Sequence, residues 1–299
     1  MLALMLKPIR LLLLFTLALG SLTAAAAEPP PLPPLNPEPG ARQLPGKIVW
    51  ADLFTSDVAA ARAFYAELFG WEWREVTDDP VPYGIFSLDG VDVAGLVAWE
   101  PSQPQRPYGR WLFYASTPNV DGAVQATLAR GGNVMSPARD VPDRGRFAIV
   151  SDPEDVPFGF IDSSSGDPGD YRARHGDWIW FNLYSRAAQA ASEYYRLAVG
   201  YTLTPDTSRS DLFDIVLSAS GHARAGIKLM PPVGANAPSW LGFIRVADAN
   251  ATAEQAVALG GEVVYTPYDG DIAMAVLRGP GGGLFGVLEW DYDDAEAAP

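Results

Sequence analysis

The chain has 299 residues, 48% of them hydrophobic, and a formal net charge of −15, so it can bury a core but offers phosphate groups an acidic surface. Binding to nucleic acid is therefore not expected. The absence of cysteine excludes disulfides and cysteine-based metal sites, and the two histidines, His175 and His222, offer few ligands to zinc, iron or copper.

The N-terminus predicts a signal peptide over residues 1–27. Lys7 and Arg10 precede an apolar run over 11–19, and small residues then lead to a predicted cleavage site after Ala27. The apolar run is short for a bilayer span, so a retained anchor is the alternative. We expect a periplasmic or secreted protein with no membrane contact beyond this export step.

Two further segments are predicted to lie outside any folded module. Residues 28–46 are rich in proline, which disfavours helices and sheets, so an extended linker acting as a spacer is expected. Residues 291–299 are mostly acidic or small and are expected to form a solvated tail.

One pattern occurs twice between these segments. The two copies keep the same order of residues, at an offset of 130 that drifts to 127 along the chain. The matching pairs are Trp50 and Trp180, Leu53 and Leu183, Gly70 and Gly200, Trp111-Leu112 and Trp240-Leu241, and Phe158-Gly159 and Phe285-Gly286. The duplication predicts a first module over 47–165, a linker over 166–176 and a second module over 177–290.

Each module is predicted to contain two βαβββ units, which makes the fold class α+β. In the first copy, a strand over 48–54 precedes a helix whose apolar residues recur every three or four positions between Val58 and Phe69. Ser56 or Asp57 can cap the start of this helix, and Gly70 can close its end. The later elements are expected as strands over 71–76, 84–88, 93–99 and 111–115, a helix over 120–130 and three strands ending at Ile161.

These residues resemble the vicinal-oxygen-chelate superfamily, which includes glyoxalase I, extradiol dioxygenases and the fosfomycin-resistance and bleomycin-binding proteins. The resemblance is closest to bacterial tandem glyoxalase-like proteins and covers 47–290. It lies in the first strand over 49–53, the helix end over 64–71 and the turn 152–154 that leads into Phe158-Gly159. It implies that the two βαβββ units of each module form a curved sheet around a concave cavity. Because this superfamily supports unrelated reactions, the resemblance indicates fold more than function.

The resemblance also implies a divalent metal in the cavity, usually held by His or Gln, His, and Glu. By motif spacing, the ligand positions fall on Trp50, Leu112 and Gly159 in the first copy and on Trp180, Leu241 and Gly286 in the second. None of these side chains suits a divalent cation. We therefore predict no metal and no other cofactor.

Strand residues alternate between the two faces of a sheet, so other residues on the cavity face can be named. They are Trp50, Asp52, Phe54, Tyr114, Trp180, Asn182 and Arg245. The aromatic residues favour a small aromatic or amphipathic ligand, although Trp50 and Trp180 could instead belong to the core. Asp52 is the candidate catalytic residue, as a general base or the partner of a ligand cation, and the alternative is that it accepts local hydrogen bonds. Arg245 either binds a ligand carboxylate or pairs with a nearby acid.

Three functional hypotheses follow. The first, which we favour, is an exported protein that binds a small molecule without a metal. The second is an enzyme of the lyase, isomerase or dioxygenase type that uses Asp52 or non-standard ligands. The third is a non-catalytic scaffold for a protein partner, with a filled cavity. The sequence leaves open whether the copies pair within one chain or across a homodimer.

Overall fold

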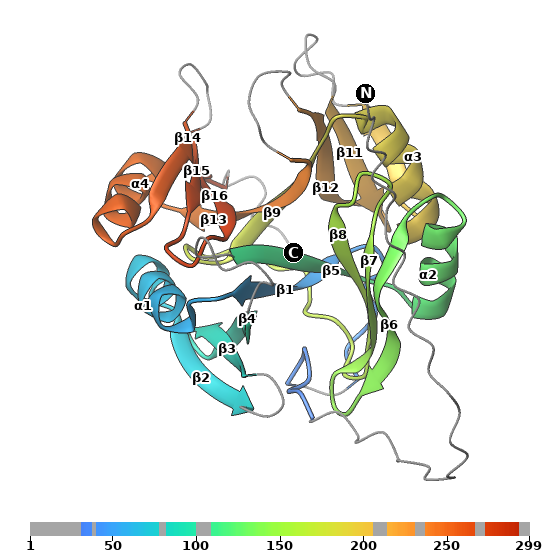
Figure 1. Cartoon of the computed structure of the whole chain (residues 1–299), viewed down its shortest axis with the longest axis horizontal. Helices are drawn as coiled ribbons and strands as arrows, with labels where there is room; N and C mark the ends of the chain where they lie inside the picture. Colours follow the sequence, from blue (N-terminus) through green and yellow to red (C-terminus); the bar gives the residue numbers. More distant parts are fainter. Residues whose placement is uncertain are drawn as a thin grey trace, which may run out of the picture.

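The computed structural model describes residues 31–37, 40–77, 82–99, 109–205, 214–230, 237–266 and 273–292, and the findings below concern this part of the chain. Within it, two eight-stranded mixed sheets and four helices form an α+β protein, and neither sheet closes into a barrel (Figure 1). The fold class expected from the sequence is thus confirmed. The expected signal peptide and residues 293–299 of the tail lie outside the described residues. No helix in the described ranges is long and apolar enough to cross a membrane.

Both copies contain their elements in the expected βαβββ-βαβββ order. The first copy comprises β1 (Ile48–Thr55), α1 (Val58–Phe69), β2 (Glu72–Thr77), β3 (Tyr83–Leu88), β4 (Val91–Ala98), β5 (Gly109–Ser116), α2 (Val120–Leu128), β6 (Asn133–Val141), β7 (Gly145–Ser151) and β8 (Pro157–Ser163). The second comprises β9 (Trp178–Ser185), α3 (Ala188–Val199), β10 (Thr202–Pro205), β11 (Asp214–Ala219), β12 (His222–Leu229), β13 (Ser239–Val246), α4 (Ala249–Ala258), β14 (Glu262–Tyr265), β15 (Met274–Arg278) and β16 (Leu284–Glu289).

Each sheet joins the two units of one copy at its centre. The strand order is β2-β3-β4-β1-β5-β8-β7-β6 in the first copy and β10-β11-β12-β9-β13-β16-β15-β14 in the second. The central strands β1 and β5 are antiparallel, with Asp52 opposite Leu112. In the first sheet, β2–β4 and β6–β8 form two arms on either side of this centre (Figure 1). We call the resulting concave face of each sheet a cup, the first cup carrying Asp52 and the second cup carrying Asn182.

The first helix forms where the apolar spacing and the capping residues predict it. The Asp57 side chain accepts a hydrogen bond from the backbone N–H of Ala60 at 2.9 Å, which satisfies a free donor of the first turn. Gly70 ends the helix in the left-handed region with φ 70°, a conformation that favours glycine. The buried face consists of Ala61, Phe64, Tyr65 and Leu68. This face turns away from the first cup, towards the core.

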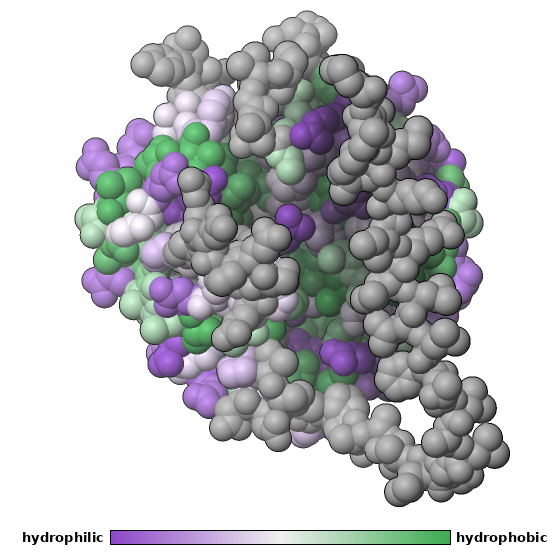
Figure 2. Space-filling model, viewed as in Figure 1, coloured by the Kyte–Doolittle hydropathy of each residue, from purple (hydrophilic) through white to green (hydrophobic). Residues whose placement is uncertain are grey.

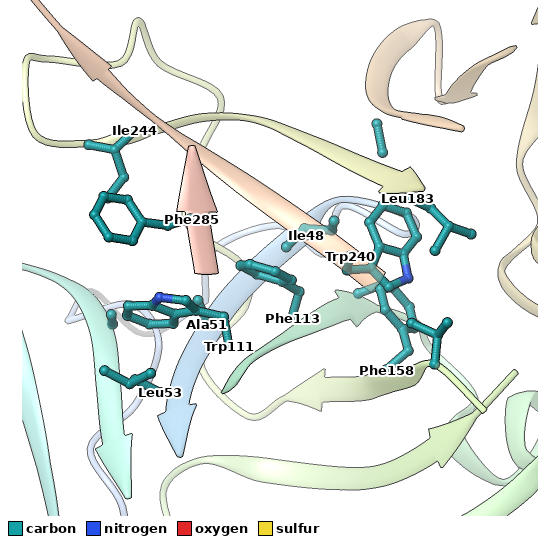
Figure 3. Packing of buried hydrophobic residues seen from close by; sticks show 14 of the residues in the cluster. Ile48, Ala51, Leu53, Trp111, Phe113, Phe158, Leu183, Trp240, Ile244 and Phe285 are labelled. Carbon is teal, nitrogen blue, oxygen red and sulfur yellow. The ribbon is translucent and has the colours of Figure 1, made fainter. Parts of the chain in front are cut away.

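The two copies pack against each other within the single chain and share one hydrophobic core. Phe285 of β16 lies against α1 of the first copy, with ring centroids 6.1 Å from Phe64 and 5.4 Å from Tyr65. In the related position, the ring centroids of Phe158 of β8 and Tyr195 of α3 lie 5.4 Å apart. Figure 3 shows first-copy and second-copy residues of this cluster packed together. Each copy therefore completes the core of the other.

Hydrogen bonds made by turn residues also link the two copies at two places. The Glu154 carboxylate accepts hydrogen bonds from the Ser185 hydroxyl and, at 3.1 Å, from the backbone N–H of Arg186. On the other side, the Thr55 hydroxyl donates to the carbonyl of Gly281 at 3.0 Å. The turn over 152–154, which carries the family resemblance, thus fastens the first copy to the second.

Asp152 in this turn provides a pH-dependent contact between the copies. Its carboxylate accepts hydrogen bonds from the backbone N–H groups of Glu154 and Val156, and from the Tyr195 hydroxyl at 3.2 Å. Burial raises the pKa of Asp152 to about 6, despite these hydrogen bonds. In the folded state Asp152 keeps its proton up to about pH 6, whereas in the unfolded chain it loses the proton near pH 4. The free energy of unfolding should therefore fall as pH rises from about 4 to about 6. In urea unfolding across this range, Asp152→Asn should remove this part of the slope, and an unchanged slope would contradict the assignment.

The proline-rich segment is not the free spacer expected from the sequence. Leu35 is buried, and Leu32 packs against the same cluster as Tyr83 and Trp50 in the first cup. The Leu32 backbone N–H donates to the carbonyl of Pro142 at 3.2 Å. In Figure 1 this blue segment lies between the arms of the first sheet. Two leucines among the prolines therefore anchor the segment across the opening of the first cup.

Candidate functional site

The first cup brings together the four first-copy residues expected to face a cavity. Trp50 and Tyr114 are buried in one apolar cluster, Phe54 packs against it, and Asp52 lies on the same strand face. The intervening residues Ala51 and Leu53 belong to the shared core instead. The other buried members of the cup cluster are Leu35, Val49, Tyr83, Ile85, Leu112, Val141, Phe147 and Ile161.

Asp52 is the acidic group at the centre of this aromatic cluster. Its Oδ1 accepts hydrogen bonds from the Trp50 indole N–H at 2.8 Å and from the Tyr83 hydroxyl at 3.1 Å. Burial raises the pKa of Asp52, although the charge of Arg144 and hydrogen bonds from Trp50, Tyr114 and Tyr83 act in the opposite direction. Asp52 thus satisfies local donors and is also a weaker acid than an exposed aspartate.

Two glycines on neighbouring strands leave the space that Asp52 and Tyr114 occupy. Gly95 pairs with Asp52, and a Cβ atom there would lie 2.0 Å from Asp52 Oδ1. Gly159 pairs with Tyr114, and a Cβ atom there would lie 2.1 Å from Tyr114 Cδ1. Gly159 is the position where the resemblance places a metal-binding glutamate. The Tyr114 ring lies over that position.

The residues of the two cups do not fit the divalent metal that the fold family implies. The positions inferred from motif spacing carry indole, aliphatic or glycine groups, which are not ligands for such an ion. Among the described residues, no three histidine, aspartate or glutamate side chains lie close enough to hold a metal ion. The donor chemistry of the cups therefore gives no support to a metal-based mechanism.

The structure adds Arg144 and Tyr83 to the first cup, and sequence reasoning missed both. Arg144 lies in the turn between β6 and β7, yet it is only 3% exposed, and its guanidinium lies 4.4 Å from the centroid of the Trp50 ring. A turn sequence predicts solvent exposure, so the pattern contains no signal for this inward direction. Tyr83 begins β3, and nothing in the sequence indicated that its hydroxyl reaches Asp52.

The second cup repeats the arrangement with an amide in place of the acid. The Trp180 indole N–H donates to Asn182 Oδ1 at 2.9 Å, as Trp50 does to Asp52. Gly226 leaves the space for this side chain, since a Cβ atom there would lie 2.4 Å from Asn182 Oδ1. Nearby on β11 and β12, Lys228 and Asp214 form an ion pair at 2.6 Å. The second cup thus lacks the carboxyl group on its first strand.

Arg245 does not join the other expected ligand-binding residues. Its guanidinium donates to the backbone carbonyls of Trp290 at 2.7 Å and Ala173 at 3.1 Å, and it lies over the Tyr292 ring. It therefore ties the C-terminal segment to the segment between the copies. Strand alternation placed Arg245 on the face of β13 opposite the core residues Trp240 and Ile244, as expected, but Arg245 lies near the end of the strand.

Trp50 and Trp180 both line a cleft between the copies, with a volume of about 610 Å³. Charged side chains that line this cleft pair with one another: Arg224 forms a bidentate ion pair with Asp170, and Lys47 also forms an ion pair with Asp170. Figure 2 shows hydrophilic and hydrophobic residues side by side in the hollowed middle of one face. The cleft is therefore a second opening next to the first cup, with its main charges already matched.

Comparison with known proteins agrees with this architecture. The Mn(II)-bound glyoxalase from Novosphingobium aromaticivorans superposes with a TM-score of 0.57 and 18% identity, over 82% of each chain. A homoprotocatechuate 2,3-dioxygenase variant from B. fuscum gives a TM-score of 0.57 at 16% identity, covering 86% of this chain and 74% of that one. At these identities, the likeness supports the fold alone.

Sequence relatives match about four fifths of this chain over nearly their own full length. The putative glyoxylase CFP32 of Mycobacterium tuberculosis is 33% identical over 247 residues, which are 80% of this chain and 93% of that protein. The anthracycline biosynthesis protein DnrV of Streptomyces peucetius is 32% identical over 262 residues, or 83% and 94% of the two chains. The model of the Glyoxalase/Bleomycin resistance protein/Dioxygenase superfamily matches residues 47–160. The chain therefore belongs to the Glyoxalase/Bleomycin resistance protein/Dioxygenase superfamily, as a tandem two-copy member.

Proposed function

We propose that this protein is exported and that its first cup binds a small aromatic or amphipathic organic molecule without a metal ion. The observation that supports this proposal is the convergence of aromatic rings and polar groups on Asp52. Aromatic walls with a few directed polar groups are typical of small-molecule sites. The relatives named for glyoxylase and anthracycline biosynthesis are compatible with a small organic ligand.

A ligand must enter the first cup past the N-terminal segment. Leu35 covers the cup and is itself buried, so a ligand that reaches Asp52 must displace it or pass beside it. The cleft between the copies is lined by Leu35, Asn36 and Trp50, and it offers a route to this edge of the cup. A scaffold would also have a filled cup, and the binding experiment below separates the two functions.

The proposal is tested by calorimetric titration of the full chain with a panel of aromatic acids, amides and amines. Saturable binding at one site per chain is expected. Tyr114→Phe should weaken it about fivefold, because one hydrogen-bonding hydroxyl is lost. Tyr171→Ala, at an exposed residue of the cleft, should leave it unchanged. Loss of binding in Tyr171→Ala alone would place the ligand in the cleft, and no binding by any panel member would favour the scaffold.

An enzymatic function is the second candidate, because the raised pKa of Asp52 suits a group that exchanges protons with a bound ligand. In that case the carboxylate form of Asp52 would take a proton from the ligand, and the hydroxyl of Tyr83 would stay hydrogen-bonded to it. Asp52→Asn should then abolish turnover and change ligand affinity less than threefold. The fold should tolerate this change, since Asn182 occupies the same place in the second copy. Turnover that survives in Asp52→Asn would contradict this role.

A further inference from the structure

The guanidinium of Arg144 is a buried cation without hydrogen-bond partners in the described part of the chain. None of its three nitrogens, Nε, Nη1 and Nη2, has an acceptor, although the residue is 3% exposed. Buried guanidinium groups normally pair all or most of their donors, because leaving them unpaired costs free energy. Arg224 follows this rule through two hydrogen bonds to Asp170.

Asp52 does not satisfy these donors. Its Oδ1 is engaged by Trp50 and Tyr83, and no ion pair within 4.0 Å joins Asp52 to Arg144 among the described residues. The guanidinium lies over the Trp50 ring, 4.4 Å from the ring centroid, in a cation–π contact that uses none of its N–H groups. The donors of Arg144 are therefore held in place, and an acceptor is missing.

We propose that Arg144 binds the carboxylate, or an equivalent oxyanion, of the organic ligand held in the first cup. This inference rests on the proposed function and adds the chemical class of the ligand, an aromatic or amphipathic acid. A guanidinium and a carboxylate form two parallel hydrogen bonds, which would satisfy the unpaired nitrogens. Tyr83 and Tyr114 lie beside Asp52 in the same cup and place aromatic rings around the rest of such a ligand.

The second copy shows no equivalent feature among its described residues. On its first strand an amide, Asn182, takes the place of the acid, and Lys228 on β12 is already paired with Asp214 at 2.6 Å. The inference therefore assigns one acid-binding site per chain, in the first cup.

Benzoate and its neutral isostere benzamide are the probes that test this inference. Calorimetric titration of the full chain is expected to give benzoate binding at one site and benzamide binding about 10- to 100-fold weaker, since a charged hydrogen-bond pair is lost. Arg144→Gln should reduce benzoate affinity by a similar factor and change benzamide affinity less than threefold. Arg130→Gln is the matched control, because it removes one positive charge from an exposed position just after α2, outside the first cup.

The outcomes separate this inference from the proposed function. Equal binding of both probes, unchanged in Arg144→Gln, would overturn the role of Arg144 and leave small-molecule binding in place. No saturable binding of benzoate up to about 10 mM would overturn the role of Arg144, and no binding by any member of the aromatic panel would overturn both. Arg144→Met gives an independent readout without ligand, because a residue that only supports the fold would lower the melting temperature when replaced. We expect no decrease, since the substitution removes an unpaired buried charge and keeps an apolar contact with Trp50; a clear decrease would also contradict the inference.

Discussion

Phe285→Ala is expected to destabilise the entire chain by about 3–5 kcal/mol, the usual cost of truncating a buried phenylalanine. Phe285 belongs to β16 of the second copy and is 0% exposed, but its ring packs on Phe64, Tyr65 and Phe69 of α1. The cavity would therefore open between the copies. Urea unfolding followed by far-ultraviolet circular dichroism and tryptophan fluorescence should show one transition, shifted equally in both signals.

Leu197→Ala is the control for this variant, because Leu197 is also apolar but 43% exposed on α3. It should change stability by less than about 1 kcal/mol. Two separate transitions in Phe285→Ala, with only one of them shifted, would mean that the copies fold independently and would contradict a shared core.

Gly159→Glu restores the residue type that the family resemblance places at the metal position, and we expect it to damage the cup. The new Cβ atom would meet the Tyr114 ring at 2.1 Å, and the carboxylate would enter an apolar cluster. Overpacking of this kind costs about 1–3 kcal/mol, and burying the charge adds to the loss. Thermal unfolding with and without Mn²⁺ should show a lower melting temperature and no metal-dependent recovery.

Gly169→Ala is the matched control, since a Cβ atom at Gly169 meets nothing within 4 Å. The double variant Gly159→Glu with Tyr114→Ala should regain part of the lost stability, because it removes the clashing ring. A melting temperature of Gly159→Glu that equals the original value would show that the cup has room for the family's ligand.

The sequence predicted the parts of the fold that local chemistry determines. Asp57 and Gly70 cap α1 as expected because capping depends on a few neighbouring backbone groups. The duplication predicted two modules with the same element order, and strand alternation placed Trp50, Asp52 and Tyr114 on one face. The strand and helix limits shifted by only a few residues.

Long-range features could not be predicted in the same way. The apolar faces of α1 and α3 would be buried equally well by the same chain or by a second chain, so the pattern alone did not determine the shared core. Leu35 was hidden among prolines that indicate a spacer, and its burial depends on the distant residues of the first cup. The turn between β6 and β7 directs the Arg144 side chain into the first cup, and the residue type alone does not indicate this direction.

The central claim is that the first cup works through Asp52, Arg144 and aromatic rings rather than through a divalent metal. Elemental analysis of the purified full chain by mass spectrometry tests it most directly. We predict far less than one equivalent of magnesium, manganese, iron, nickel or zinc per chain. Metal close to one equivalent per chain, lost in Asp52→Asn, would contradict the claim and make Asp52 a metal ligand.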